Sequence, residues 1–165
     1  MMLRENEMLD MDLLDYEEEE DTQQDKFLTF FINKEEDGID IRYVTEIIGI
    51  QNITEVPDMS AYIKGVINLR GKVIPVMDVR LRFGLEERPY DDRTCIIVIN
   101  VEDQAVGLIV DQVSEVLDIP EGDIEPPPRL YRGDRGSFLL GMGKVEDGVK
   151  ILLDAQKLLF EGEGS

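Results

Sequence analysis

The sequence predicts a mainly β protein in which two similar β-barrels pack together, and an internal repeat is the main observation behind this fold. VTEIIGI at 44–50 matches VSEVLDI at 113–119, and GVINLRGKVIPVMD at 65–78 aligns without a gap with GMGKVEDGVKILLD at 141–154. In both halves the last strand ends at an aspartate that opens a short helix. A chain that repeats one unit of short strands closed by a small helix favours two packed barrels.

The chain is organised around the stretch at 65–84. Its β-branched and apolar residues suit two strands, and the turn between them contains Gly71, which can supply the positive φ that many hairpin turns need. Pro75 cannot donate a hydrogen bond to a sheet, so it predicts an edge position or a bulge. Asp78 suits a helix N-cap, and Gly84 suits a helix stop. The stretch therefore predicts strand, turn, strand and short helix.

Upstream of this stretch, FLTFFIN at 27–33 predicts a strand and KEEDG at 34–38 predicts a turn. Extended structure resumes at 39–41. Four apolar residues then recur at spacings of three and four, which predicts one or two helical turns before the chain extends again at 48–57. These residues are Ile41, Val44, Ile47 and Ile48.

Downstream, the polar and turn-rich segment LEERPYDDR at 85–93 separates the two halves. Strands are predicted at 94–101 and 105–110, and the segment that matches the first repeat follows at 111–119. Three consecutive prolines and later glycines at 120–138 indicate an irregular loop.

These boundaries give the predicted domain organisation. Residues 1–25 form an acidic N-terminal tail, and residues 26–160 form the folded domain. Within it, we expect the first β-barrel repeat at about 26–86 and the second at about 87–160. Residues 161–165 are expected to be a flexible C-terminus.

The N-terminal tail holds 11 acids and one base, so half of the net charge of −20 lies in it. One interpretation is a solvated, mostly disordered segment. The alternative is a short amphipathic helix that folds against a partner. The apolar residues that would form its inner face are Met8, Leu9, Met11, Leu13, Leu14 and Tyr16.

Composition excludes several classes of protein. The excess of 37 acids over 17 bases argues against nucleic acid or an anionic membrane surface as a partner. No run approaches the roughly 20 apolar residues that span a bilayer, and the acidic start does not resemble a signal peptide. The single cysteine, Cys95, lies in an apolar run and is expected to be a small buried hydrophobe. We therefore expect a cytoplasmic protein.

The sequence also offers no catalyst. It contains no histidine, which removes the commonest general base and the histidine metal sites. Its clustered acids at 17–21, 35–37 and 91–92 lie in the tail and in turns, and their spacing does not match a calcium loop. The glycines at 141–143 lack the third glycine of a dinucleotide fingerprint, and no Walker sequence is present. We therefore expect no enzyme activity, no metal and no cofactor.

Two charged residues stand in apolar surroundings. Arg70 lies at the tip of an apolar hairpin, and Glu46 lies among the apolar residues of 44–48. Each is either an ordinary solvated charge or one half of an ion pair that orders the rim of an apolar groove. Because exposed ion pairs add little stability, such a pair would act on shape and on the choice of partner.

Three motifs carry a family resemblance: GIDIRYVTEI at 38–47, YIKGVINLRGKVIPVMDVRLRFG at 62–84 and AVGLIVDQVSEVL at 105–117. In this order and spacing, the chain from about Phe27 to Phe160 resembles the CheW family of chemotaxis coupling proteins. The resemblance implies two five-stranded, SH3-like β-barrels with short helices. It also implies a non-catalytic adaptor that joins the cytoplasmic tips of methyl-accepting chemoreceptors to the regulatory domain of the histidine kinase CheA. Such a protein would be recruited to receptor arrays at the membrane and would help to assemble them.

The same resemblance implies two sites. A receptor-binding groove between the barrels would accept a helical tip by burying apolar side chains while charges set its register. Its residues would be Ile41, Val44, Glu46, Gly65 and Arg70 from the first repeat and Val113 and Val116 from the second. The kinase would bind elsewhere on the first barrel, near Thr54 and Val56. Because Glu146 and Asp147 replace Arg70 and Gly71 in the second repeat, the two barrels are not expected to bind one partner equivalently.

Other functions remain open at this point. A CheW-like paralogue would serve another chemosensory pathway, such as one governing pili or gene expression. The CheW-like part of a larger kinase is disfavoured because the chain lacks a nucleotide-binding region, and a fused receiver because only EGEGS follows Phe160. A ligand-binding or catalytic double barrel would require a pocket with converging polar groups.

Overall fold

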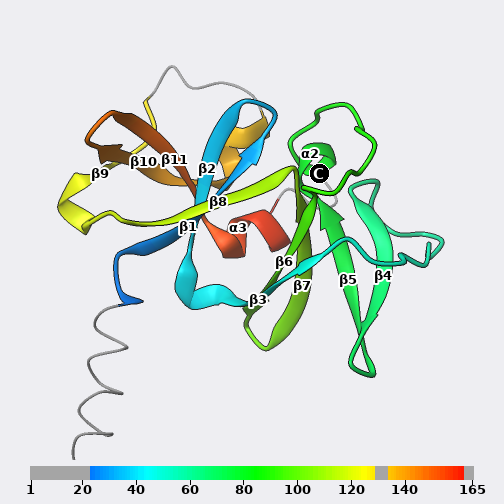
Figure 1. Cartoon of the computed structure of the whole chain (residues 1–165). Coiled ribbons are helices and arrows are strands. Elements are labelled where there is room, and N and C mark those ends of the chain that lie inside the picture. The colour runs from blue at the N-terminus through cyan, green and yellow to red at the C-terminus, as the bar shows by residue number, and fades with distance from the viewer. Residues whose placement is uncertain (1–22, 129–133, 162–165) are drawn as a thin grey trace, which may run out of the picture.

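The computed structural model describes residues 23–128 and 134–161, which form two β-sheets with short helices beside them (Figure 1). The predicted acidic tail lies outside these residues apart from 23–25, and residues 162–165 of the predicted C-terminus also lie outside them. Within the described ranges, no helix has the length and apolarity to cross a membrane.

The first sheet has six strands in the order β8-β1-β2-β11-β10-β9. Its strands are β1 (Lys26–Ile32), β2 (Glu35–Asp40), β8 (Gln112–Asp118), β9 (Ile124–Glu125), β10 (Leu139–Val145) and β11 (Gly148–Leu153). Neighbouring strands are antiparallel except β2 and β11, which are parallel.

The second sheet has five strands in the order β3-β6-β7-β5-β4. Its strands are β3 (Val44–Gly49), β4 (Ile63–Leu69), β5 (Lys72–Asp78), β6 (Cys95–Val101) and β7 (Gln104–Val110). Two α-helices, α2 (Val79–Arg82) and α3 (Ala155–Phe160), follow the hairpins β4-β5 and β10-β11. Three 3-10 helices complete the described chain: η1 (Ile41–Tyr43), η2 (Glu121–Asp123) and η3 (Asp134–Phe138).

Each sheet combines strands from both sequence repeats. The first-repeat strands β1 and β2 pair with second-repeat strands β8 and β11, while the second-repeat strands β6 and β7 pair with first-repeat strands β3 and β5. When each strand is replaced by its repeat equivalent, β8-β1-β2-β11-β10 becomes β3-β6-β7-β5-β4, the order of the other sheet. The two repeats therefore exchange their first hairpins. The division into 26–86 and 87–160 describes the repeat in the sequence and not the two sheets.

Each sheet curls so that the chain leaving one edge strand reaches the opposite edge. After β3, the backbone of Thr54 exchanges two hydrogen bonds of 2.9 Å with Val66 of β4. After β8, the short strand β9 pairs with β10 in the same way. This curled, mainly β arrangement agrees with the predicted pair of SH3-like β-barrels, although the strand pairing among the described residues closes neither sheet into a full ring.

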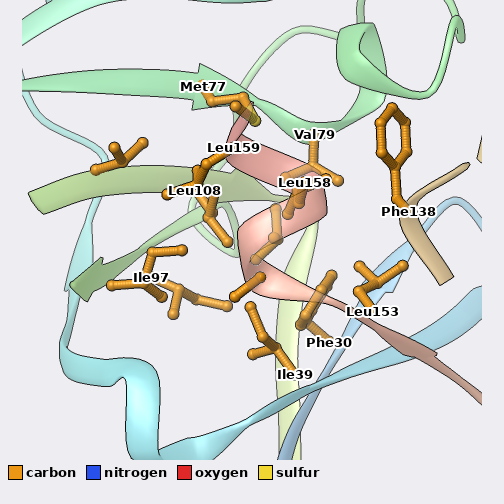
Figure 2. Packing of buried hydrophobic residues seen from close by; sticks show 14 of the residues in the cluster. Phe30, Ile39, Met77, Val79, Ile97, Leu108, Phe138, Leu153, Leu158 and Leu159 are labelled. Carbon is orange, nitrogen blue, oxygen red and sulfur yellow. The ribbon is translucent and has the colours of Figure 1, made fainter. Parts of the chain in front are cut away.

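The main hydrophobic core lies between the two sheets (Figure 2). Phe30 and Ile39 enter it from the six-stranded sheet, Ile97 and Leu108 enter it from the five-stranded sheet, and Leu158 of α3 packs among them. All five side chains are completely buried. Because burying such a side chain contributes about 1.5–3 kcal/mol, this shared core holds the two sheets together.

Two smaller clusters fill the opposite faces of the sheets. Ile67, Ile74 and Ile96 belong to the cluster of the five-stranded sheet, and Phe27 and Leu152 belong to that of the six-stranded sheet. The central strands are thus buried on both faces. This double burial explains the unbroken apolar run CIIVI at the start of β6, which has no alternation of polar and apolar residues.

Both short helices begin as the sequence predicts. The Asp78 carboxylate accepts a hydrogen bond of 2.9 Å from the backbone N–H of Arg80, and the Asp154 carboxylate accepts one of 3.1 Å from Lys157. These bonds satisfy N–H groups that the first turn of a helix leaves without a partner. Gly84, with φ of 77°, lies just past the end of α2, as predicted.

Two buried arginines of α2 join it to the second half of the chain. Arg80 donates two hydrogen bonds of 2.8 Å to the Asp111 carboxylate, between β7 and β8. The guanidinium of Arg82 lies between the rings of Tyr62 and Phe138, 4.3 and 4.4 Å from their centres, and donates hydrogen bonds to carbonyls at the end of α3. Charge and aromatic contacts therefore reinforce the packing around α2.

Four local predictions are wrong or incomplete. The predicted helical turns at 41–48 are a single 3-10 turn followed by β3, and most of the predicted turn at 34–38 belongs to β2. Cys95 is half-buried and not fully buried, and its thiol donates to the carbonyl of Arg93 at 3.3 Å. The predicted edge position of Pro75 is incomplete, because β5 lies between β7 and β4. Pro75 precedes the pairing with β7, so its missing N–H leaves no ladder position empty.

Candidate functional site

The predicted ion pair between Arg70 and Glu46 is present and spans the two edges of the five-stranded sheet. Glu46 lies on edge strand β3, and Arg70 lies in the turn after edge strand β4. The pair can form only because the sheet curls. The turn itself is held by a hydrogen bond of 2.8 Å from the Gly71 N–H to the Asn68 side chain, which fixes the position from which Arg70 extends.

The pair leaves most of its arginine accessible. The Arg70 side chain is 69% exposed and the Glu46 side chain 27% exposed. The hydrogen bond and the charge of Glu46 raise the pKa of Arg70, so the guanidinium stays charged at any physiological pH. The arrangement presents a permanent, oriented cation at the tip of a hairpin and keeps donors free for a partner.

The predicted apolar site residues lie on β3 and β8, which are edge strands of the two sheets, and in the 3-10 turn that precedes β3. Val44 of β3 and Val113 of β8 occupy equivalent repeat positions, and both are half-buried against the main core. Val116 of β8 is 47% exposed, and its repeat equivalent Ile47 of β3 is 44% exposed. Ile41 is half-buried in the 3-10 turn that leads into β3. The predicted residues thus follow two matched edges.

Ile47 was missed as a candidate site residue. The spacing at 41–48 predicted helical turns that include Ile47, whereas the structure places this residue on the exposed face of β3. The internal repeat contained the signal, because Ile47 aligns with Val116, which was predicted.

Gly65 has a structural function that the sequence alone did not show. Its φ is 151°, and a Cβ atom there would overlap the carbonyl of Thr54, which is the acceptor that ties the chain after β3 to β4. In the second repeat, a Cβ on Gly141 would lie 2.7 Å from the carbonyl of Glu125 in β9. Glycine is therefore needed in both repeats where the crossing chain meets the hairpin.

One of the two predicted kinase-binding residues, Val56, lies at a separate hollow of about 400 Å³. Val56 is 39% exposed and lines this hollow with Ile63 and Leu81, and an ion pair between Lys64 and Glu87 borders it. Thr54 is not part of the lining, but its backbone pairing with β4 holds the segment that carries Val56. A hollow that combines apolar side chains with paired charges suits a protein partner.

The second half of the molecule carries a different charge pattern at the equivalent positions. Glu115 is the repeat equivalent of Glu46, so the acid is kept, but Glu146 takes the place of Arg70. No ion pair of the same kind can therefore form. A hollow of about 320 Å³ lies between these two acids, with Leu117 and Val145 in its lining. The repeat therefore offers the same geometry in both halves but opposite charge at the hairpin tip.

Another hollow, of about 550 Å³, contains none of the predicted site residues. Its lining includes Tyr43, Leu140, Ile124 and Arg42, and the last is already paired with Asp40 at 2.7 Å. Among the residues that the structure describes, no group of three or more histidine, cysteine, aspartate or glutamate side chains is placed to hold a metal.

Comparisons with known proteins agree on one family. Residues 26–163 match the family described as the CheW-like domain. The chain is 38% identical over 138 residues to the chemotaxis protein CheW of Klebsiella aerogenes, covering 84% of this chain and 83% of that protein. It is 37% identical over 135 residues to the chemotaxis protein CheW of Bacillus subtilis, covering 82% of this chain and 86% of that protein.

The fold agrees with a solved structure as well. The crystal structure of the scaffolding protein TtCheW from Thermoanaerobacter tengcongensis superimposes with a TM-score of 0.77 at 39% identity, covering 86% of this chain and 95% of that chain. A shorter similarity, 34% over 70 residues, relates 42% of this chain to 39% of the protein PilI of Pseudomonas aeruginosa.

Proposed function

This chain belongs to the family of CheW-like domains and is an adaptor of chemotaxis signalling, and we propose that it couples two particular partners. They are the cytoplasmic tip of a methyl-accepting chemoreceptor and the regulatory domain of the histidine kinase CheA. On this proposal the protein is not an enzyme and needs no cofactor. It works in the cytoplasm, is recruited to receptor arrays at the membrane and helps to assemble them.

The ion pair between Arg70 and Glu46 is the observation that carries the receptor half of the proposal. It holds an exposed guanidinium near exposed and half-buried apolar side chains of an edge strand. A helical receptor tip that presents both apolar and acidic residues would bury the former and hydrogen-bond to the latter. The proposed receptor-binding residues are Ile41, Val44, Glu46, Gly65, Arg70, Val113 and Val116, with Gly65 acting through the backbone geometry it permits.

The separate hollow beside Val56 supports the kinase half of the proposal. Its lining shares no residue with the proposed receptor-binding set, which is compatible with both partners binding to one molecule. An adaptor needs this separation, because partners that compete for one surface cannot be bridged. The proposed kinase-binding residues are Thr54, which positions the segment, and Val56, which makes the contact.

The similarity to PilI favours one alternative. The same adaptor fold would then serve a different chemosensory pathway, with different receptor and kinase partners at the same two surfaces. Binding to receptor and kinase fragments from the protein's own organism, tested pathway by pathway, separates the two proposals.

A charge-reversal series tests the receptor surface. We expect Arg70→Glu to weaken binding of a receptor tip fragment at least tenfold, because it places two acids together and removes the exposed cation. Lys72→Glu reverses a neighbouring exposed charge outside the pair and is the matched control. Unchanged binding by folded Arg70→Glu, measured by calorimetry, would overturn the receptor site; loss of strand signal in circular dichroism would show that Arg70 is structural.

A further inference from the structure

The parallel pairing of β2 and β11 joins the first repeat to the second and is the seam between them. Asp37 is a completely buried carboxyl in this seam. It lies on β2, opposite Phe30 of β1 and Ile151 of β11. Alternation along β2 places its side chain on the same face as Ile39, which belongs to the main core. An acid therefore occupies a position whose neighbours in register are apolar on both sides.

The Asp37 carboxyl has no partner among the described residues. Neither of its oxygens makes a hydrogen bond, and burial raises its pKa to about 8. Lys150 is the cation of β11 and precedes Ile151. It lies on the other face of the sheet and pairs with Glu36 at 2.8 Å. The two arginines of α2 donate to the acceptors described above. Glu35, on the same face of β2, is an acid and offers no compensating charge.

We propose that Asp37 is a proton-binding switch in this seam: its neutral carboxyl is compatible with the β2-β11 pairing, and its ionisation weakens that pairing. An unpaired charge in an apolar interior is strongly unfavourable, and moving the strand toward water relieves it. The seam is short enough to respond, because β2 and β11 share only the register pairs at Asp37, Gly38 and Ile39. It is also where the exchanged first hairpin meets the second repeat.

The sign of the effect follows from proton linkage. The folded protein holds a proton on Asp37 that the unfolded chain releases near its ordinary pKa of 3.8. Relative to a neutral side chain, Asp37 therefore lowers the folding equilibrium constant tenfold for each pH unit between about 4 and 8. Above pH 8, Asp37 is ionised in both the folded and the unfolded protein. Its effect on the folding equilibrium constant then no longer changes with pH.

A carbon-13 titration of the aspartate side-chain carboxyls of the whole protein tests the protonation. We expect one signal with a midpoint near pH 8 that disappears in Asp37→Asn and persists in Asp147→Asn, which removes an exposed turn carboxyl. If the signal that disappears in Asp37→Asn titrates below pH 6, or if no aspartate of the wild type titrates above pH 6, the proposal fails. The wild-type titration decides the matter even where Asp37→Asn folds poorly.

Amide hydrogen exchange tests the coupling to the seam. After correction for the intrinsic pH dependence of exchange, protection of the β11 amides at Leu152 and Leu153 should fall about tenfold between pH 7 and pH 9 in the wild type. It should remain constant in Asp37→Asn, and the β6 amide of Ile97 serves as an internal control in both proteins. Equal protection at the two pH values in the wild type would show that ionisation leaves the seam intact.

Discussion

Single residues in this protein combine a structural function with a proposed binding function, and Gly65 is the clearest example. The family resemblance places it in a receptor-binding set, but the structure gives it a second function at the point where the chain crosses onto β4. Its positive φ and the close Thr54 carbonyl both exclude a side chain.

We therefore expect Gly65→Ala to destabilise the fold by about 1–3 kcal/mol from backbone strain, plus the cost of displacing Thr54. Gly49→Ala is the control, because a Cβ there meets no atom within 4 Å, and it should change stability by less than about 0.5 kcal/mol. Urea unfolding of both variants measures the difference. Equal stability of the two variants would show that the crossing chain moves away without cost.

The buried pair of Arg80 and Asp111 predicts that the stability of the fold depends on pH with a sign opposite to that of the Asp37 effect. Burial alone would raise the pKa of Asp111, but hydrogen bonds from Arg80 and from the Asn33 backbone outweigh burial and hold the pKa below its usual value of 3.8. The stabilisation from Asp111 is thus complete above pH 3.8 and is lost as the pH falls through the lower, folded-state value.

Asp111→Asn should cost about 3 kcal/mol at pH 7, because it leaves a mostly buried guanidinium without its charge partner. The cost should shrink as the pH falls below 4. Unfolding in urea from pH 3 to pH 7 measures this convergence with the wild type, and a cost that does not depend on pH would contradict the charge-pair interpretation.

The sequence predicts some of these residues and misses others for physical reasons. Arg70 and Glu46 stood out because charges in apolar surroundings are few, and they do pair. The burial of Asp37 could not be predicted, because it lies in the acidic segment at 34–38 that was predicted as a turn, and only the pairing with β11 takes it into the core. Local sequence carries no information about such a distant strand.

At the scale of elements, hairpins and helix starts were predictable and the segment at 41–48 was not. The hairpin β4-β5, its turn and the following helix all lie where the apolar runs and Asp78 predict them. Between Val44 and Glu46 a β-bulge inserts an extra residue, so the apolar residues on either side lose the two-residue period of a strand. The 3-10 turn before the bulge completes a spacing that imitates a helix.

The two helix caps predict a difference in stability. Asp154→Ala removes a side-chain cap, which costs about 1 kcal/mol. Asp78→Ala should cost more, because the Asp78 carboxylate is buried and also accepts a hydrogen bond of 2.8 Å from the Tyr90 hydroxyl. An unpaired, partly buried hydroxyl adds about 1–3 kcal/mol. Thermal unfolding of both variants measures the order, and a larger loss in Asp154→Ala would contradict it.

At the scale of the whole molecule, the repeat gave the number and order of elements but not the exchange of hairpins between sheets. The local sequence pattern is satisfied equally well whether each first hairpin pairs with its own repeat or with the other repeat. The choice is made by the parallel pairs β2-β11 and β5-β7 and by the core shared between the sheets. Because each sheet needs strands from both repeats, we expect neither repeat to fold alone.

The folded domain should begin close to residue 25. The Asp25 carbonyl accepts a hydrogen bond of 2.7 Å from the Ile119 N–H, which ties this residue to the end of β8. Deleting residues 1–22, with most of the acidic charge of the tail, should leave the circular dichroism spectrum and the urea midpoint of the domain unchanged. Loss of strand signal in this deletion variant would show that the tail contributes to a sheet.

The proposed bridging function requires two surfaces that work at the same time. A titration of the isotope-labelled protein, followed by its backbone amide shifts, tests it most directly: first with a receptor tip fragment, then with the kinase regulatory domain added to that complex. We predict shifts around Val44, Glu46, Arg70 and Val113 with the first partner and further shifts near Val56 with the second. Displacement of the first partner by the second, or one patch common to both, would contradict an adaptor that bridges them.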